Sequence, residues 1–224
     1  MIKNIINLGD SALYCDFGEE VNKKINLKVI NFFKKLKKLK IKGVTNISPS
    51  YNKLIISFEL SETNFQELKD KILNIKFEDF TKEESENIQI PICCDEEFTL
   101  DLKRLSSSLN ISKEEIIKKF LEKNYYCYMT GFIAGMPFLG DIDEKLRFKR
   151  LETPRVKVPK GAVGITEQFC NIYTFESPGG WNIIGNTPEK VFDKLNSNNP
   201  ALIKPGDNIN FYKISKKEYL NWND

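Results

Sequence analysis

Histidine is absent from this chain of 224 residues. It is the commonest general base and metal ligand near neutral pH, so any chemistry here must use other side chains. The five cysteines stand at 15, 93, 94, 127 and 170, and no Cys-x-x-Cys pair occurs. An odd count without paired spacing argues against a disulfide framework or a zinc site, and favours buried thiols in a reducing cytoplasm.

Long hydrophobic runs are missing as well. No apolar run approaches membrane-spanning length, and the opening residues, MIKNIINLGDS, lack the apolar segment of a signal peptide. Charge is nearly balanced, with 34 basic and 31 acidic residues and a net charge of +3. Such a balance gives no reason to expect a nucleic-acid surface or a membrane patch. We therefore predict a cytoplasmic protein that binds neither nucleic acid nor membrane.

The part of the chain before about residue 85 has the pattern of a small α+β domain. Alternating apolar residues predict four strands, and apolar residues three and four apart predict two helices. The expected strands are 2–7, 12–17, 44–48 and 54–58, and the expected helices are 20–39, ended by Gly43, and 64–75. The order β-β-α-β-β-α predicts a sandwich-like domain with helices on one face of a sheet. The charged stretch 82–87 is expected to be a linker between domains 1–85 and 86–224.

The second domain is expected to begin with a strand at 88–92 and a short helical insertion. Ser112 and Glu115 fit a capping box at the start of its second helix. This region could also be taken for a helix-turn-helix, but its second helix lacks a row of base-reading side chains. From 125 to 211, short apolar runs alternate with Gly and Pro, which predicts a β-rich unit such as a barrel.

Three stretches rich in Gly and Pro stand out in this second domain: GFIAGMPFLG at 131–140, TPRVKVPKGAVGI at 153–165 and SPGGWNIIGNTP at 177–188. In this order they resemble the family of the 5-oxoprolinase B subunit, also described as Kip-type kinase inhibitors and as allophanate hydrolase subunit 1. The resemblance extends to GDSALYCDFG, GVTNISPSYNKLIISF, IPICCDEEFTLDL and NPALIKPGDNINF. It therefore covers nearly the whole chain.

The resemblance implies an N-terminal α+β domain followed by a cyclophilin-like β-barrel, in agreement with the division drawn above. It implies one member of an ATP-hydrolysing complex with subunits C and A that opens the ring of 5-oxo-L-proline to L-glutamate. The chain contains no GxxxxGK[ST] phosphate loop, so ATP is expected to be bound by the complex and not clearly by this chain alone. No turnover is expected from the isolated chain.

The resemblance also implies alternatives. One branch of the family restrains a sporulation histidine kinase, and a protein of that kind should carry an exposed apolar patch on its C-terminal domain. A helper of a biotin-dependent carboxylase or amidohydrolase acting on urea-like substrates is a third possibility suggested by the older family name.

Arg155 is the first candidate for chemistry. It is one of four arginines in a chain where lysine is far commoner, and arginine binds carboxylate or phosphate through two parallel hydrogen bonds. A surface ion pair is the competing interpretation. Lys157 is expected on the same strand face because it lies two residues further on. Arg155 and Lys157 are therefore the predicted catalytic residues.

The glycine-rich segments are the candidate substrate site. Gly179 and Gly180 permit a sharp turn that leaves backbone N–H groups free for a ligand. A tight turn above a core Trp181 is the competing interpretation, and Ser177 and Thr187 either reach the ligand or cap a turn. The predicted substrate-binding residues are Gly131, Phe132, Gly135, Pro137, Ser177, Gly179, Gly180, Trp181 and Thr187.

Several positions depart from the pattern of the family. Glu122 stands where the family carries His, Tyr126 where it carries Arg, Phe169 where it carries Gln and Asn186 where it carries Arg. Ala134, Met136 and Asp141 also differ within the 131–141 segment. The residues retained mainly shape the backbone, whereas several of those replaced are polar. A divergent, non-catalytic scaffold subunit is therefore a further alternative.

Overall fold

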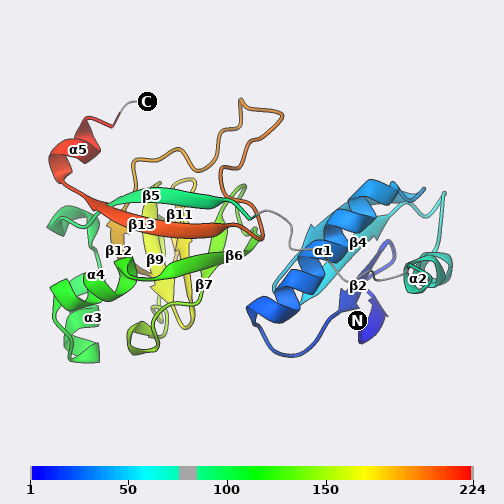
Figure 1. Cartoon of the computed structure of the whole chain (residues 1–224), viewed down its shortest axis with the longest axis horizontal. Helices are drawn as coiled ribbons and strands as arrows, with labels where there is room; N and C mark the ends of the chain where they lie inside the picture. Colours follow the sequence, from blue (N-terminus) through cyan, green and yellow to red (C-terminus); the bar gives the residue numbers. More distant parts are fainter. Residues whose placement is uncertain (1, 76–84, 223–224) are drawn as a thin grey trace. The chain divides into compact units, whose positions relative to one another are not determined.

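The computed structural model describes residues 2–75 and 85–222 (Figure 1). It divides into two compact units, Met1–Glu84 and Ser85–Asp224. Most of the stretch at 82–87, expected to be a linker, either lies outside the described residues or precedes the first strand of the second unit. None of the helices in the described ranges is both long and apolar enough to cross a bilayer.

The first unit, within residues 2–75, is an antiparallel sheet with two helices. Its strands are β1 (Asn4–Asn7), β2 (Ala12–Asp16), β3 (Val44–Pro49) and β4 (Lys53–Phe58), in the spatial order β1-β2-β4-β3. Its helices are α1 (Lys23–Leu39) and α2 (Phe65–Leu73). The predicted order β-β-α-β-β-α is confirmed, and α1 lies across the sheet in front of β4 (Figure 1).

Alternation explains why both helices cover one face of this sheet. In β4, Leu54, Ile56 and Phe58 are buried while the residues between them are half-exposed. Side chains of β2, β4, α1 and α2 form one apolar cluster, which includes Phe32 of α1 and Leu68 of α2. Burial of this surface is the main force that holds the layers together.

The end of α1 at Leu39 agrees with the prediction, but the residue that closes the helix differs. The C-cap is Lys40, which adopts the left-handed conformation with φ 44°, and not Gly43. Gly43, with φ +84°, lies in the turn that leads into β3, where an added Cβ would come 2.8 Å from Thr63 Cγ2. Glycine is therefore needed in the turn after the helix and not as the helix cap.

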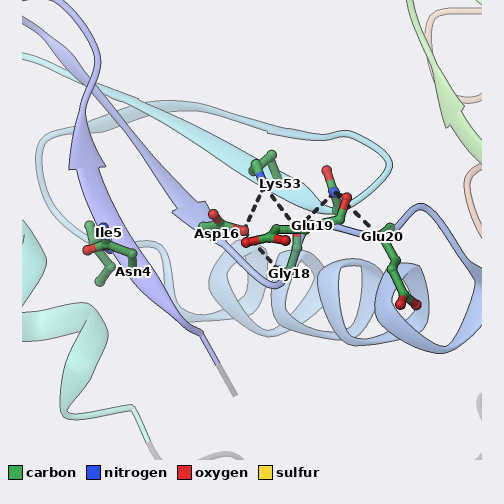
Figure 2. A network of polar contacts seen from close by, with 8 residues as sticks. Asn4, Ile5, Asp16, Gly18, Glu19, Glu20 and Lys53 are labelled. Atoms are coloured by element: carbon green, nitrogen blue, oxygen red, sulfur yellow. Dashed lines mark hydrogen bonds and ion pairs between the residues drawn. The ribbon is translucent and has the colours of Figure 1, made fainter.

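A polar network fastens the β2–α1 loop to the β3–β4 hairpin (Figure 2). Lys53 Nζ donates to Asp16 Oδ1 at 2.7 Å and to the Gly18 carbonyl at 3.0 Å. The Gly18 N–H also donates to Asp16 Oδ1, at 2.8 Å. Asn52 Nδ2 donates to the carbonyls of Gly18 and Glu19 at 2.9 and 3.0 Å. The loop is thus held by side chains rather than by a strand ladder.

The second unit is a closed β-barrel with an attached two-stranded ribbon. The barrel strands are β5 (Asn87–Cys93), β6 (Asn124–Thr130), β7 (Pro137–Gly140), β9 (Ala162–Thr166), β10 (Phe169–Ile172), β12 (Asn182–Asn186) and β13 (Asn208–Ile214). Their order is β10-β7-β6-β13-β5-β12-β9, and β13 runs parallel to β5. The ribbon pairs β8 (Arg155–Val158) with β11 (Ser177–Gly179).

Short helices complete this unit and include the predicted helical insertion. They are the 3-10 turns η1 (Glu96–Phe98) and η2 (Glu144–Leu146), and the helices α3 (Leu102–Leu109), α4 (Lys113–Leu121) and α5 (Lys216–Leu220). Ser112 caps α4 by accepting from the Glu115 N–H at 3.1 Å, as predicted. The Glu115 carboxylate instead pairs with Lys119 at 3.3 Å, whereas a reciprocal capping box forms at Ser215 and Glu218 of α5.

Two apolar layers result from the alternation of barrel side chains. Val163 and Ile165 of β9 face the barrel interior together with Cys170 and Ile172 of β10. A second, smaller group, which we call the outer cluster, consists of Met136, Val158, Ala162, Tyr173 and Ile183. The outer cluster lies between the outer wall of the barrel and the ribbon, since Val158 belongs to β8. The predicted α+β fold with a β-barrel is confirmed, and the five cysteines are free.

Candidate functional site

A cavity of about 330 Å3 opens beside the outer cluster. Its walls are aromatic, from Phe132, Phe138, Tyr173 and Trp181, and Phe138 packs edge to face against Trp181 with ring centroids 5.6 Å apart. The remaining lining residues are Met136, Arg150, Pro154, Pro178, Gly179 and Gly180. A mostly apolar hollow of this size with a few polar groups is typical of a small-molecule site.

The two adjacent glycines shape this cavity in different ways. A Cβ on Gly179 would lie 2.2 Å from the Tyr173 hydroxyl, so no larger residue fits without moving that ring. A Cβ on Gly180 would meet nothing closer than the Leu151 carbonyl oxygen at 3.5 Å. Gly179 is therefore required by the close approach of Tyr173, whereas Gly180 leaves open space.

A buried carboxylate lies behind the ribbon. The side chain of Asp101 is 3% exposed, and its Oδ1 accepts from Arg155 Nη2 at 2.7 Å. Its Oδ2 accepts from the Ile183 N–H at 2.7 Å, and Arg104 Nε lies 3.7 Å from Oδ1. Two guanidinium groups share one carboxylate, so the cluster carries a net positive charge. Among the described residues, Arg155 Nη1 is buried and has no hydrogen-bond partner.

Lys157 does not share the strand face of Arg155, contrary to the prediction. Its side chain is 75% exposed and pairs with Glu176 at 3.1 Å, while the Arg155 side chain is 28% exposed. The pairing of β8 with β11 shifts register between Ser177 and Gly179. This irregularity breaks the strict alternation on which the prediction depended.

The other predicted site residues fall into two groups. Phe132, Gly179, Gly180 and Trp181 line the cavity, and the nearby Ser177 Oγ is buried without a partner among the described residues. The rest lie outside the lining. The Gly131 N–H donates to the Met136 carbonyl, and Gly135 packs against Phe192. Pro137 begins β7, and the Thr187 hydroxyl accepts from the Glu189 N–H.

Four residues near this site were missed by the sequence reasoning: Asp101, Arg150, Asn171 and Tyr173. A signal existed for Arg150, because the argument that singled out Arg155 as a retained arginine applies to it equally. Tyr173 is 1% exposed, and burial raises the pKa of its hydroxyl against opposing effects from the Asn171 amide, the Trp181 N–H and Arg155. The phenol therefore stays protonated and can donate a hydrogen bond.

Of the positions that depart from the family pattern, Met136 lines the cavity, whereas the others lie outside its lining. Glu122 caps the C-terminus of α4. Tyr126 and Phe169 each pack edge to face against Tyr128. The Asn186 amide donates to the Lys160 carbonyl at 3.0 Å and accepts from the Tyr219 hydroxyl at 2.9 Å. These four replacements therefore do not change the cavity walls, whereas Met136 is part of one.

Comparison with known proteins identifies the family to which this chain belongs. Residues 3–203 match the family described as carboxyltransferase domain, subdomain C and D. The 5-oxoprolinase B subunit of Bacillus subtilis (strain 168) is 31% identical over 229 residues, which cover 96% of this chain and 94% of the relative. The B subunit of the Haemophilus influenzae 5-oxoprolinase is 32% identical over 213 residues, covering 93% and 96%. The chain belongs to the family of 5-oxoprolinase B subunits.

A solved structure shares this fold. The crystal structure of TTHA0988 superposes with a TM-score of 0.81 and 27% sequence identity, and the match covers 92% of this chain. The present chain spans 40% of the length of that protein. The likeness therefore extends over both units of this chain but only part of the other.

Proposed function

We propose that this chain is the B subunit of an ATP-dependent 5-oxoprolinase complex, which opens the ring of 5-oxo-L-proline to L-glutamate together with subunits A and C. The relationship to two bacterial B subunits over more than nine tenths of the chain carries the proposal. The division into functional domains 1–85 and 86–224 and a cytoplasmic location belong to the same proposal.

The chemistry explains why a B subunit would need partners. A lactam is a poor electrophile because of amide resonance, so its carbonyl must be activated or its developing charge must be stabilised. ATP would supply the activation, and this chain has no phosphate loop to bind it alone. We therefore place ATP binding in the complex and assign to this chain the holding of the substrate.

The cavity suits the shape and charge of 5-oxoproline. Its aromatic walls would cover the apolar edges of a five-membered ring. Arg150 lies exposed at the lining and forms no ion pair with any described residue, so its guanidinium is available for the substrate carboxylate. The positive cluster of Arg155 and Arg104 around Asp101 would add attraction for an anion.

Hydrogen-bond donors near the glycine turn support a role in charge stabilisation. The Tyr173 hydroxyl borders the cavity, and the Trp181 backbone N–H is close enough to lower its pKa. The phenol O–H would donate where negative charge grows on a carbonyl oxygen. The backbone amides of Gly179 and Gly180, predicted for this role from the sequence, belong to residues that line the same cavity.

Reconstitution tests the proposal. The chain is mixed with subunits A and C, and glutamate formed from 5-oxoproline and ATP is measured. We expect product from the full mixture and none from the chain alone. If the full mixture yields no glutamate while the Bacillus subtilis complex assayed in parallel is active, the proposal is wrong. Inhibition of a histidine kinase stays a prediction that these findings do not test.

A further inference from the structure

Asn171 is the exception among the buried asparagines of this structure. Asn26, Asn182 and Asn186 each hydrogen-bond to carbonyl oxygens or other polar groups. Asn171 is 0% exposed, and neither Nδ2 nor Oδ1 makes a hydrogen bond of regular geometry with a described residue, although the amide is near enough to the Tyr173 hydroxyl to lower its pKa. Leaving both atoms of a buried amide unpaired is unfavourable, so such a group calls for an explanation.

The register of the barrel strands places this amide at the cavity. Asn171 of β10 pairs with Phe138 of β7 on one side and with Gly164 of β9 on the other. Tyr173 follows two residues later on the same face of the strand. A Cβ added to Gly164 would lie 2.9 Å from both Asn171 Oδ1 and Trp181 Cβ. Three neighbours of the amide, Phe138, Tyr173 and Trp181, are thus walls of the cavity.

We propose that Asn171 recognises the lactam of the substrate, with Nδ2 donating to the ring carbonyl and Oδ1 accepting from the ring N–H. This inference rests on the proposed function. In a five-membered lactam the amide is held cis, so its N–H and C=O point to the same side. A side-chain carboxamide presents a matching donor and acceptor, and the pair closes with two parallel hydrogen bonds. A trans peptide amide cannot form both bonds, which makes Asn171 selective for cyclic amides.

Access to the amide depends on Trp181. Its side chain is partly exposed and follows directly after Gly179 and Gly180, while Asn171 lies beside its Cβ. Because Asn171 is 0% exposed and is not one of the lining residues, the indole would have to rotate toward solvent for substrate to reach the amide. The unpaired amide is therefore a preorganised group that is satisfied only when substrate is bound.

The test compares two ligands on the reconstituted complex. One is 5-oxoproline, and the other is 3-oxocyclopentane-1-carboxylate, which keeps the carbonyl and carboxylate but replaces the ring N–H by CH2. We expect the wild-type complex to bind the carbocycle roughly tenfold more weakly, as measured by competition, because Asn171 Oδ1 is left unpaired. In Asn171→Ala this preference should disappear, and the KM for 5-oxoproline should rise roughly tenfold. Asn186→Ala, which removes an amide satisfied inside the protein, should keep the preference.

Equal binding of the two ligands by an active wild-type complex would overturn this inference and leave the proposed function standing. A retained preference in Asn171→Ala would do the same. A wild-type complex that converts no 5-oxoproline, beside an active Bacillus subtilis control, would overturn both. If Asn171→Ala does not fold, Asn171→Leu, which keeps the side-chain volume without a donor or acceptor, takes its place in the same comparison.

Discussion

Arg155 and Asp101 are joined by an ion pair of 2.7 Å that ties the ribbon to the start of α3. Asp101 also exchanges two hydrogen bonds with Ile183 of β12, one from its own N–H at 3.0 Å and one to its Oδ2 at 2.7 Å. One residue thus connects a helix, a barrel strand and the ribbon that borders the cavity. Arg155 does not line the cavity itself, but it holds the ribbon beside the cavity and is a source of positive charge.

Replacing Asp101 by Asn should strongly destabilise the second unit. The change keeps the side-chain shape but leaves Arg155 and Arg104 without their shared anion, which we expect to lower the free energy of unfolding by about 3 kcal/mol. Urea unfolding followed by tryptophan fluorescence measures this, because both tryptophans, Trp181 and Trp222, lie in the second unit.

Glu176→Gln is the matched control for Asp101→Asn. It also removes one carboxylate from an ion pair on the ribbon side, but that pair with Lys157 is exposed. Exposed pairs contribute little, so its unfolding midpoint should equal that of the wild type. Equal midpoints for Asp101→Asn and Glu176→Gln would show that the buried carboxylate does not hold the ribbon.

Arg150→Gln should weaken substrate binding without slowing the bound complex. If Arg150 holds the carboxylate of 5-oxoproline, loss of its bidentate hydrogen bonds should raise KM roughly tenfold while kcat stays near the wild-type value. Arg147→Gln is the control, since Arg147 faces Glu144 in η2 and does not line the cavity. An unchanged KM in Arg150→Gln would remove this residue from the substrate site.

The secondary structure could be predicted from the sequence because local patterns determine it. The alternation Leu54, Ile56, Phe58 and the capping residue Ser112 each specify their element with neighbours a few residues away. The pairing of Arg155 with Asp101 joins residues 54 apart, and no local pattern encodes it. The register shift between β8 and β11 likewise could not be predicted, and it places the Lys157 side chain on the exposed face of the ribbon and not on the face of Arg155.

At the cavity, too, local features could be predicted from the sequence whereas long-range contacts could not. The glycine-rich run indicated that something must approach the backbone closely, but not that the approaching atom is the Tyr173 hydroxyl. Asn171 looked like any polar residue of a short strand, and its isolation appears only once Phe138 and Gly164 are placed beside it. Shape-forming residues could thus be predicted, whereas the polar groups that they enclose depended on the tertiary fold.

Alanine should lower the stability of the protein at Gly179 but not at Gly180. Gly179→Ala forces its Cβ against the Tyr173 hydroxyl, at 2.2 Å in the present geometry, and the ring must shift within a packed cluster. We expect a loss of about 2 kcal/mol of unfolding free energy. Gly180→Ala meets no atom closer than 3.5 Å, so its stability should match the wild type. Thermal melts of both variants check this, and equal melting temperatures would contradict the close approach.

Acid should selectively weaken the network around Asp16 in the first unit (Figure 2). Burial alone would raise the pKa of the Asp16 carboxyl, but hydrogen bonds from Lys53 and the Gly18 N–H, with the charges of Lys53 and Lys3, outweigh it and lower the pKa. A carboxyl with a lowered pKa in the folded state stabilises the fold fully above its unfolded pKa, and this stabilisation is lost as the pH falls through the folded value.

The comparison of wild type with Asp16→Asn isolates that effect. At pH 7 the variant should unfold at lower urea concentration, as followed by far-UV circular dichroism, and the difference should shrink as the pH falls below about 4, where the unfolded carboxyl takes up its proton. Asp10→Asn, at an exposed site in the β1–β2 turn, should show no such convergence. The contrary result is a difference in unfolding midpoint between wild type and Asp16→Asn that stays constant from pH 7 to pH 3. Protonation of Asp16 would then cost the folded and unfolded chains the same free energy, so the Lys53 contact would contribute no charge-dependent stability.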